Sequence, residues 1–241
     1  PGGEQGDMNV LIVTAHPDDM EILCAGTAVR YALRGDSVTI CHACTGSLGH
    51  MVIPPEELVP IRWEEAEKAA KIAGLRHETL GLPDLQVTER DEVVCLLASL
   101  IRDVRPDVII THDPNDYMPD HSDLAHLVLK SSFVATLPHH EHVDGECFAV
   151  VSPVFFMDTV MGVGFVPEEY VDITDVFDTK KAMLACHASQ VDWLRDHDGI
   201  DVIENMRVCA QYRGLQCGRK YAEAFRVNRT WPRVTTERLL P

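Results

Sequence analysis

The sequence predicts an α/β protein in which a mostly parallel, Rossmann-like sheet is flanked by helices and followed by a mixed C-terminal extension. Short apolar runs alternate with amphipathic segments of helical length. The apolar runs are typical of strands that are buried on both faces. Hydrophobic residues make up 46% of the 241 positions, which is enough for one compact core. We interpret residues 1–241 as a single domain, with a Rossmann-like core at 8–157 and an extension at 158–241 packed on it.

Two strand–helix units open the chain. The apolar run at 9–14 (NVLIVT) predicts a buried strand, and the amphipathic segment at about 20–33 predicts a helix that ends at Gly35. The run at 37–44 predicts a second strand. After a loop rich in glycine and proline, a helix is expected at about 55–73.

The rest of the core continues the same alternation, with strands expected at 77–82, 107–112 and 148–157 and helices at 88–104 and 121–137. Thr88 and Asp91 resemble a capping box at the start of one of these helices. Strands that alternate with helices favour a parallel sheet with right-handed crossovers. Beyond residue 157 the pattern weakens to a short strand near 170–173, a helix at about 175–189 and a mixed helical tail.

Charge and composition exclude several classes of partner. The net charge of −17 comes from 21 basic and 38 acidic side chains, so nucleic acid and anionic membrane surfaces are repelled. No apolar stretch reaches the roughly 18 residues of a membrane span, and the first residues lack the pattern of a secretory signal. The eight cysteines are scattered and form no disulfide framework. We therefore expect a cytoplasmic protein.

Polar residues follow the predicted strands at their carboxyl ends, where open α/β sheets bind ligands. They occur after the first, second, third and fourth strands, at 16–19, 45–47, 83–84 and 112–121. If the strands are parallel, all of these residues line one rim of the sheet. No G-x-G-x-x-G fingerprint follows the first strand, which argues against a dinucleotide site.

His16 and Asp19 suggest a metal site. They are three residues apart where a loop becomes a helix, so both side chains can face one point. Imidazole and carboxylate suit Zn²⁺, and a catalytic zinc usually takes three protein ligands. His121, after the fourth strand, is the best candidate for the third ligand.

Asp18 lies between two of these candidate ligands and points elsewhere, so its carboxylate is free to accept a proton from water. Asp113 or Asp120 could orient a metal ligand by a hydrogen bond. The plainer alternative is that Asp18 or Asp19 only caps the helix that starts there.

The segment Ala15-His16-Pro17-Asp18-Asp19 resembles the metal motif of the LmbE-like zinc de-N-acetylases, the family of N-acetylglucosaminyl-phosphatidylinositol de-N-acetylase and of the mycothiol and bacillithiol deacetylases. The resemblance continues in the family's order over nearly the whole chain. It includes the segments 9–27, 45–46, 62–66, 82–84, 116–121, 187–190 and 221–225.

The resemblance implies that His16, Asp19 and His121 bind zinc and that Asp18 is the general base. It also implies that Arg62 and Asp84 contact sugar hydroxyls. Arg62 could instead form an i,i+3 pair with Glu65, and Asp84 could simply shape a Pro-Asp turn.

One position departs from the family pattern, because Met118 stands where many members have a histidine that stabilises the oxyanion or protonates the leaving amine. Either Asp18 carries the proton itself or another group replaces that histidine. His187 is the preferred substitute and Tyr117 the next. His187 could instead only interact with a helix dipole.

The resulting hypothesis is a metal-dependent hydrolase that removes acetyl from a small N-acetylated amino sugar, with Zn²⁺ or another divalent ion such as Fe²⁺ as its cofactor. Two alternatives remain: a hydrolase of another N-acyl amide or of a thiol conjugate, and a non-catalytic module that binds a sugar or a metal. The resemblance also implies a homo-oligomer, a trimer or hexamer. The histidine-rich segment 139–142 could hold a metal, but it reads as a solvated loop.

Overall fold

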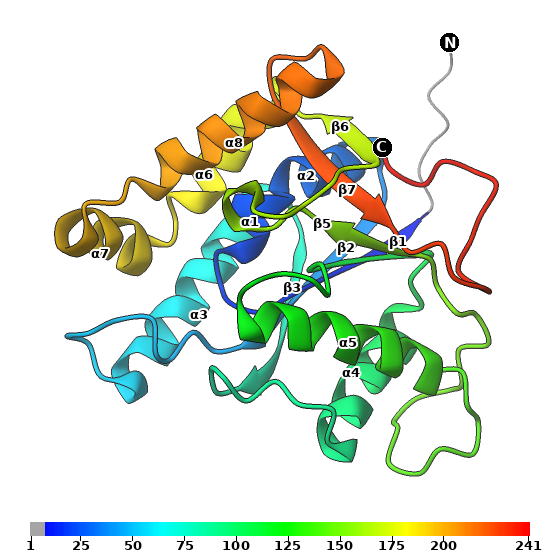
Figure 1. Ribbon diagram of the computed structural model, residues 1–241. Coiled ribbons are helices and arrows are strands. Elements are labelled where there is room, and N and C mark those ends of the chain that lie inside the picture. Colours follow the sequence, from blue (N-terminus) through cyan, green and yellow to red (C-terminus); the bar gives the residue numbers. More distant parts are fainter. Residues whose placement is uncertain (1–7) are drawn as a thin grey trace.

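The computed structural model describes residues 8–241 and confirms an α/β fold built on a mostly parallel sheet (Figure 1). In this part of the chain the sheet has seven strands: β1 (Asn9–Thr14), β2 (Ser37–Cys44), β3 (Arg76–Leu82), β4 (Val108–Thr111), β5 (Val154–Met157), β6 (Glu169–Asp172) and β7 (Ala222–Val227). Their order is β3-β2-β1-β4-β5-β7-β6. Strands β1 to β5 pair in parallel, whereas β7 runs antiparallel to both of its neighbours. The C-terminal extension thus adds two strands to the same sheet.

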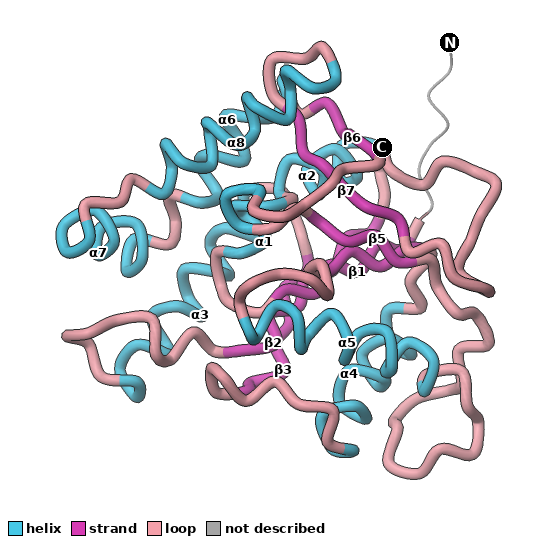
Figure 2. Tube along the Cα trace, in the orientation of Figure 1, coloured by secondary structure: helices cyan, strands magenta, loops and turns pink. Residues whose placement is uncertain are grey.

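Helices cover both faces of this sheet (Figures 1 and 2). They are α1 (Asp19–Leu23), α2 (Ala25–Arg34), α3 (Pro55–Ile72), α4 (Asp91–Val104), α5 (Pro119–Val134), α6 (Phe177–Leu184), α7 (Ala188–Asp198) and α8 (Val202–Cys217), with short 3₁₀ turns at Val160–Gly162 and Thr174–Val176. None of the helices within residues 8–241 combines the length and the apolar character that a bilayer crossing requires.

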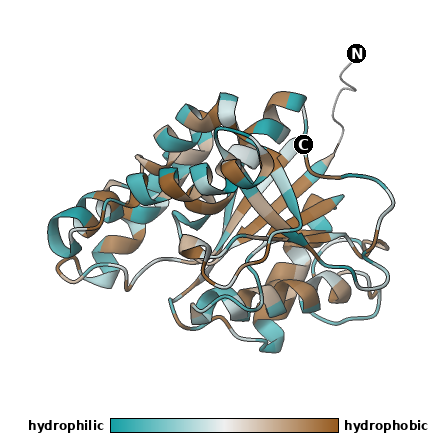
Figure 3. Ribbon diagram, turned by 45° about the horizontal axis from the view of Figure 1, so that its top comes forward, coloured by the Kyte–Doolittle hydropathy of each residue, from teal (hydrophilic) through white to brown (hydrophobic). Residues whose placement is uncertain are grey.

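The alternation of side chains along the strands builds two hydrophobic cores. Ile12 of β1 joins the core beneath α1, α2, α6 and α8, and Leu11 joins the core beneath α4 and α5. Both residues are fully buried. The central strands accordingly appear among the hydrophobic segments in Figure 3. A sheet that is covered on both faces leaves its carboxyl edge as the place for a polar site.

The helix expected at 20–33 is wrong in one respect, because it is two helices that break at Cys24 (φ −146°). The start of α2 exposes backbone N–H groups that need acceptors. Glu223 of β7 accepts from the N–H groups of Gly26 and Thr27 at 2.8 and 2.7 Å. A residue almost two hundred positions away therefore caps α2, and the local sequence carries no sign of it.

Three other expectations about the core elements were wrong in detail. Thr88 makes no capping box: Arg90 precedes α4, and the Thr88 hydroxyl accepts from the Arg90 side chain at 3.0 Å. Helix α5 begins at Pro119, because proline fits the first turn of a helix. The strand expected at 148–157 shortens to β5, because Phe148 and Ser152 bond outside the sheet: the Phe148 N–H donates to the Ala135 carbonyl at 3.1 Å, and the Ser152 carbonyl accepts from Arg233 Nη1 at 2.8 Å.

The C-terminal tail differs most from the expectation. The helix expected at 175–189 ends at Leu184, and α7 starts after His187. The sequence pattern predicts a helical tail over the residues that form strand β7, and this prediction is wrong there. The strand pairs with β5 and β6, so its conformation is fixed by neighbours that are distant in the sequence.

Candidate active site

Three side chains converge where β1 and β4 end. His16 lies in the turn after β1, Asp19 is the first residue of α1, and His121 is in the first turn of α5. The Asp19 Oδ2 atom is 3.4 Å from His16 Nδ1 and 3.3 Å from His121 Nε2. The ligand atoms of the three residues all lie within 4.8 Å of one another.

A carboxylate fixes each of the two imidazoles from its far side. His16 Nε2 donates to Asp120 Oδ2 at 2.9 Å, and His121 Nδ1 donates to Asp116 Oδ2 at 3.0 Å. These bonds select the tautomers that leave His16 Nδ1 and His121 Nε2 with lone pairs toward Asp19. Such carboxylate–histidine pairs are typical of metal sites and raise the basicity of the ligand.

The residues present fit a divalent metal. His121 Nε2 is buried without a hydrogen-bond partner although a carboxylate oxygen faces it. Two electron-rich atoms that face each other in a buried position need a cation or a proton between them. Ligand atoms on a tetrahedral Zn²⁺ lie roughly 3.3 Å apart, from bond lengths of about 2.0–2.1 Å. The separations from Asp19 match this value.

Protons compete with a metal ion for the ring nitrogens of His16 and His121. Burial lowers the pKa of His16, but hydrogen bonds to Asp120 and Asp19 outweigh it and raise the pKa to about 10. Burial likewise opposes a charge on His121, yet Asp19 and Asp116 raise its pKa to about 9. Metal binding must therefore displace protons, and acid will weaken it.

Asp18 points away from this cluster. Its φ of 109° lies in the left-handed region that disfavours residues with a side chain, and this turn separates the directions of Asp18 and Asp19. The Asp18 side chain caps no backbone group of α1, so the capping alternative is wrong for this residue. Its Oδ2 accepts from Arg62 Nη2 at 3.1 Å. Burial raises the pKa of Asp18 to about 6, although Arg62 opposes the shift.

Arg62 and Asp84 build the wall beside this carboxylate. Arg62, from α3, donates to the carbonyls of Gly46 and Pro17 and makes no ion pair with Glu65, which accepts from Ser189 instead. Asp84 accepts from the backbone N–H groups of Gly46 and Leu48, at 2.8 Å each. The two side chains thus hold the loop after β2 against the site.

A cavity of about 450 Å³ opens above the cluster. Its polar lining comprises His16, Asp18, Asp19, Arg62, Asp84, Asp120 and Gln190. The structure therefore brings two of the three predicted ligands, the predicted base and both predicted sugar contacts to one cavity, while the third ligand, His121, is fully buried outside the lining. The cavity is large enough for a small ligand.

Besides His121, three of the predicted site residues lie outside the cavity lining. Asp113 is engaged by Asn115 and by Arg226, at 2.8 Å from the arginine Nε, and orients no histidine. Tyr117 is 56% exposed. His187 is fully buried at the start of α7, with its Nε2 atom 3.4 Å from Glu21 Oε2, and this neighbour raises its pKa against the effect of burial.

The sequence reasoning missed two residues of the cluster. Asp116 lies within the motif at 116–121, yet its contact with His121 depends on the turn between β4 and α5. His112 stacks on His121, with ring centroids 3.8 Å apart, and its Nε2 accepts from the Ala15 N–H at 2.9 Å. Burial lowers the pKa of His112 to about 4, so this ring is neutral. Its place at the end of β4 was the only available signal.

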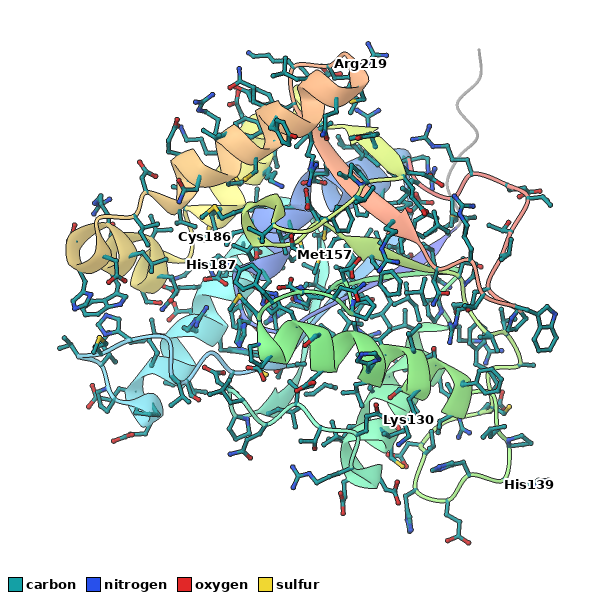
Figure 4. All side chains as sticks on the ribbon, viewed as in Figure 1. Lys130, His139, Met157, Cys186, His187 and Arg219 are labelled. Atoms are coloured by element: carbon teal, nitrogen blue, oxygen red, sulfur yellow. The ribbon has the colours of Figure 1, made fainter. Side chains whose placement is uncertain are left out.

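The histidine-rich segment 139–142 lies elsewhere. Figure 4 shows His139 in a loop at the far side of the molecule from His187. Among the described residues, no metal-binding group of three includes any of these histidines. His140 instead makes a local hydrogen bond, in which its Nδ1 donates to the Glu141 carbonyl at 2.9 Å.

The fold and the cluster define an α/β protein with a candidate metal centre at the carboxyl edge of its sheet. The chain belongs to the PIG-L family, described as GlcNAc-PI de-N-acetylase, whose sequence profile matches residues 11–132. This confirms the family resemblance found in the sequence. The matched region includes the three candidate ligands and Asp18.

Relatives and solved structures cover most of the chain. Diacetylchitobiose deacetylase of Thermococcus kodakarensis is 29% identical over 228 residues, covering 90% of this chain and 82% of the relative. The structure of N,N'-diacetylchitobiose deacetylase from Pyrococcus horikoshii, in complex with an inhibitor, is 26% identical with a TM-score of 0.80, covering 92% of this chain and 84% of that one. GalB of Pseudomonas putida KT2440, a 4-carboxy-2-hydroxymuconate hydratase, is 25% identical with a TM-score of 0.79, covering 95% and 99%. The same fold therefore carries both amide hydrolysis and hydration.

Proposed function

We propose that this protein is a metal-dependent hydrolase that removes the acetyl group from an amino sugar of the N-acetylglucosamine type, releasing acetate and a free amine. The observation that carries the proposal is the division of labour between neighbours: Asp19 converges with two histidines, while Asp18 stays outside that cluster and faces the cavity. A protein that only binds a metal or a sugar does not need this second carboxylate.

His16, Asp19 and His121 would hold the metal, with Zn²⁺ as the proposed ion and Fe²⁺ as the alternative. A divalent ion at this position supplies a Lewis acid that lowers the pKa of water to about 7 and polarises the acetyl carbonyl. Asp120 and Asp116 keep the two imidazoles in their ligating tautomers.

Asp18 accepts the proton of the attacking water. General bases of this kind contribute about 10²–10⁴ in rate. Its pKa of about 6 keeps it ionised at neutral pH yet basic enough to take a proton. The same carboxyl group then delivers the proton to the leaving nitrogen. The cavity lining supports Asp18 in this second role over His187 and Tyr117, because Asp18 alone of the three reaches the cavity.

Arg62 and Asp84 face the sugar side of the cavity. Arg62 keeps the Asp18 carboxylate in place, and its guanidinium borders the space that a hydroxyl would occupy. Asp84 accepts two backbone hydrogen bonds, and a carboxylate has lone pairs for further donors. We propose both residues as contacts to substrate hydroxyls.

Amine release from zinc-loaded protein tests the proposal. The substrates are N-acetylglucosamine, diacetylchitobiose and N-acetylated amino acids. A counter-assay measures the addition of water to 4-carboxy-2-hydroxymuconate, the compound for which the hydratase GalB is named. We expect amine release from the acetylated sugars and none from apo protein. Turnover of acetylated amino acids alone would contradict the proposed substrate class and favour an N-acyl amino acid hydrolase. Water addition to the muconate alone would contradict the proposed reaction and favour a hydratase. Zinc binding without any turnover would favour a binding module.

A further inference from the structure

The lining of the cavity above the cluster is chemically mixed. Besides the polar groups described above, it contains hydrophobic side chains from seven segments of the chain, and we call this hydrophobic part of the lining the mouth: Ile22, Leu48, Leu85, Met118, Val160, Met161, Leu194, Ile200 and Val202.

Four of the hydrophobic side chains at the mouth are exposed. Leu48, Leu85, Met161 and Ile200 have exposed fractions of 58%, 68%, 50% and 39%. None of the four belongs to either hydrophobic core, so core packing does not account for them. Exposed apolar side chains gathered at one cavity indicate a binding surface.

Backbone hydrogen bonds join two of these residues, Leu48 and Leu85, to carboxylates of the polar site. Asp84 accepts from the N–H of Leu48 at 2.8 Å, and Asp120 accepts from the N–H of Leu85 at 2.9 Å. Leu85 and Met161 adopt φ values of 62° and 61°, which are unfavourable for residues with large side chains. The mouth is therefore built together with the polar site.

Charge narrows the class of ligand further. The cavity lining contains the carboxylates of Asp18, Asp19, Asp84 and Asp120, and Arg62 is the one lysine or arginine among the described residues that line it. The Arg62 charge is already compensated by Asp18. His16, the other basic side chain of the lining, is paired with Asp19 and Asp120. A phosphate or carboxylate on the substrate would therefore find no unpaired cationic side chain among the described residues of this lining.

We propose that the acetylated amino sugar is linked to an uncharged apolar group, an alkyl, acyl or aryl aglycone, which occupies this mouth. This inference rests on the proposed deacetylase function and names the substrate class of the same site. The group linked to the acetylated sugar is then apolar and is not a second sugar. The aglycone binds next to the exposed side chains of Leu48, Leu85 and Met161.

A series of neutral alkyl glycosides of N-acetylglucosamine, from methyl to hexyl, measures the contribution of the mouth. Burial of a methylene group is worth about 0.8 kcal/mol, which corresponds to roughly fourfold in kcat/KM for each carbon that enters. We expect zinc-loaded protein to show this rise over the first few carbons. A glycoside in which a phosphate joins the sugar to the same alkyl chain should be turned over more slowly.

Leu48→Asn together with Met161→Asn is expected to lower the hexyl-to-methyl ratio of kcat/KM by about tenfold or more, because about two or more methylene contacts are lost. The matched control is Leu33→Asn, because Leu33 is equally apolar and 75% exposed but lies on α2 outside the cavity lining. This variant should keep the wild-type ratio. Equal kcat/KM for methyl and hexyl glycosides, or an unchanged ratio in the double variant, would overturn the proposal.

Two further measurements separate the causes of failure. If no acetylated sugar releases amine, the deacetylase function is refuted, and calorimetric binding of hexyl against methyl glycoside tests the mouth alone. Light scattering after size exclusion gives the oligomeric state of the wild type and the double variant. Dissociation of an oligomer in the variant, with an unchanged hexyl-to-methyl ratio, would assign the mouth to a second copy of the chain.

Discussion

Replacing Arg62 with glutamine should shift the acid limb of the pH–activity profile toward higher pH. The rate depends on ionised Asp18, so kcat/KM falls as pH drops through the pKa of that carboxyl. Burial raises this pKa to about 6, and Arg62 is the largest influence in the opposite direction. Loss of the guanidinium therefore removes the main force that keeps Asp18 ionised.

The geometry sets the size of the shift. The Arg62 Nη2 and Asp18 Oδ2 atoms are 3.1 Å apart, and both side chains are largely buried, with 3% and 15% exposed. An opposite charge at such a distance lowers a carboxyl pKa by about 1–3 units. We expect the acid limb of Arg62→Gln to lie about 1–3 units above that of the wild type, with at least a several-fold loss of kcat/KM at pH 7. A bound dication lowers the pKa of Asp18 in the wild type and in the variant alike. The test is therefore the difference between the acid limbs of the two proteins.

The assay is kcat/KM for an acetylated sugar over the pH range, with metal content measured at each pH. Arg62→Lys keeps the charge and should shift the limb less than glutamine does. Arg34→Gln removes an arginine whose ion pair with Asp36 is remote from the cavity lining, and it should leave the profile unchanged. An acid limb of Arg62→Gln at the wild-type position, or below it, would refute the assignment of Asp18 as the base.

Four further outcomes are expected. Asp18→Asn should bind zinc stoichiometrically by atomic absorption yet lose about 10²–10⁴ in kcat, and wild-type turnover would exclude Asp18 as the base. Asp116→Ala should weaken zinc affinity by about 10–100-fold in a competition titration with a chelator, because the His121 tautomer is no longer held; unchanged affinity would show that the contact does not matter for the metal. Zinc affinity of the wild type should fall as pH drops from about 10 through 9 and below, since the metal-free protein holds protons on His16 and His121, and a pH-independent affinity would argue against these ligands. His187→Gln should retain most of kcat if Asp18 returns the proton to the amine, whereas a loss as large as that of Asp18→Asn would transfer this role to His187.

The parts of the fold that follow from local sequence were predictable. The buried strands β1 and β2 carry apolar runs that permit little else, and both fall at the predicted residues. Local patterns failed where distant residues decide the structure. The break at Cys24 depends on Glu223 as a cap for α2, and β7 depends on pairing with β5 and β6.

The candidate site shows the same division. His16 and Asp19 are close in sequence, so a three-residue spacing was sufficient to place them together. His121 could be added because parallel strands end at one edge of the sheet. The role of Asp116 could not, since it depends on how the turn before α5 aims its carboxylate. The exposure of Tyr117 and the burial of His187 are likewise tertiary properties that the chain order does not encode locally.

Anomalous diffraction at the zinc edge from crystals of the zinc-loaded protein tests the central claim most directly. We predict one strong peak bounded by His16 Nδ1, Asp19 Oδ2 and His121 Nε2, at about 2.0–2.2 Å from each, with both oxygens of Asp18 outside bonding distance. A peak among His112, Asp116 and His121, or a zinc ion ligated by Asp18, would contradict the division between metal ligands and base on which the proposed chemistry depends.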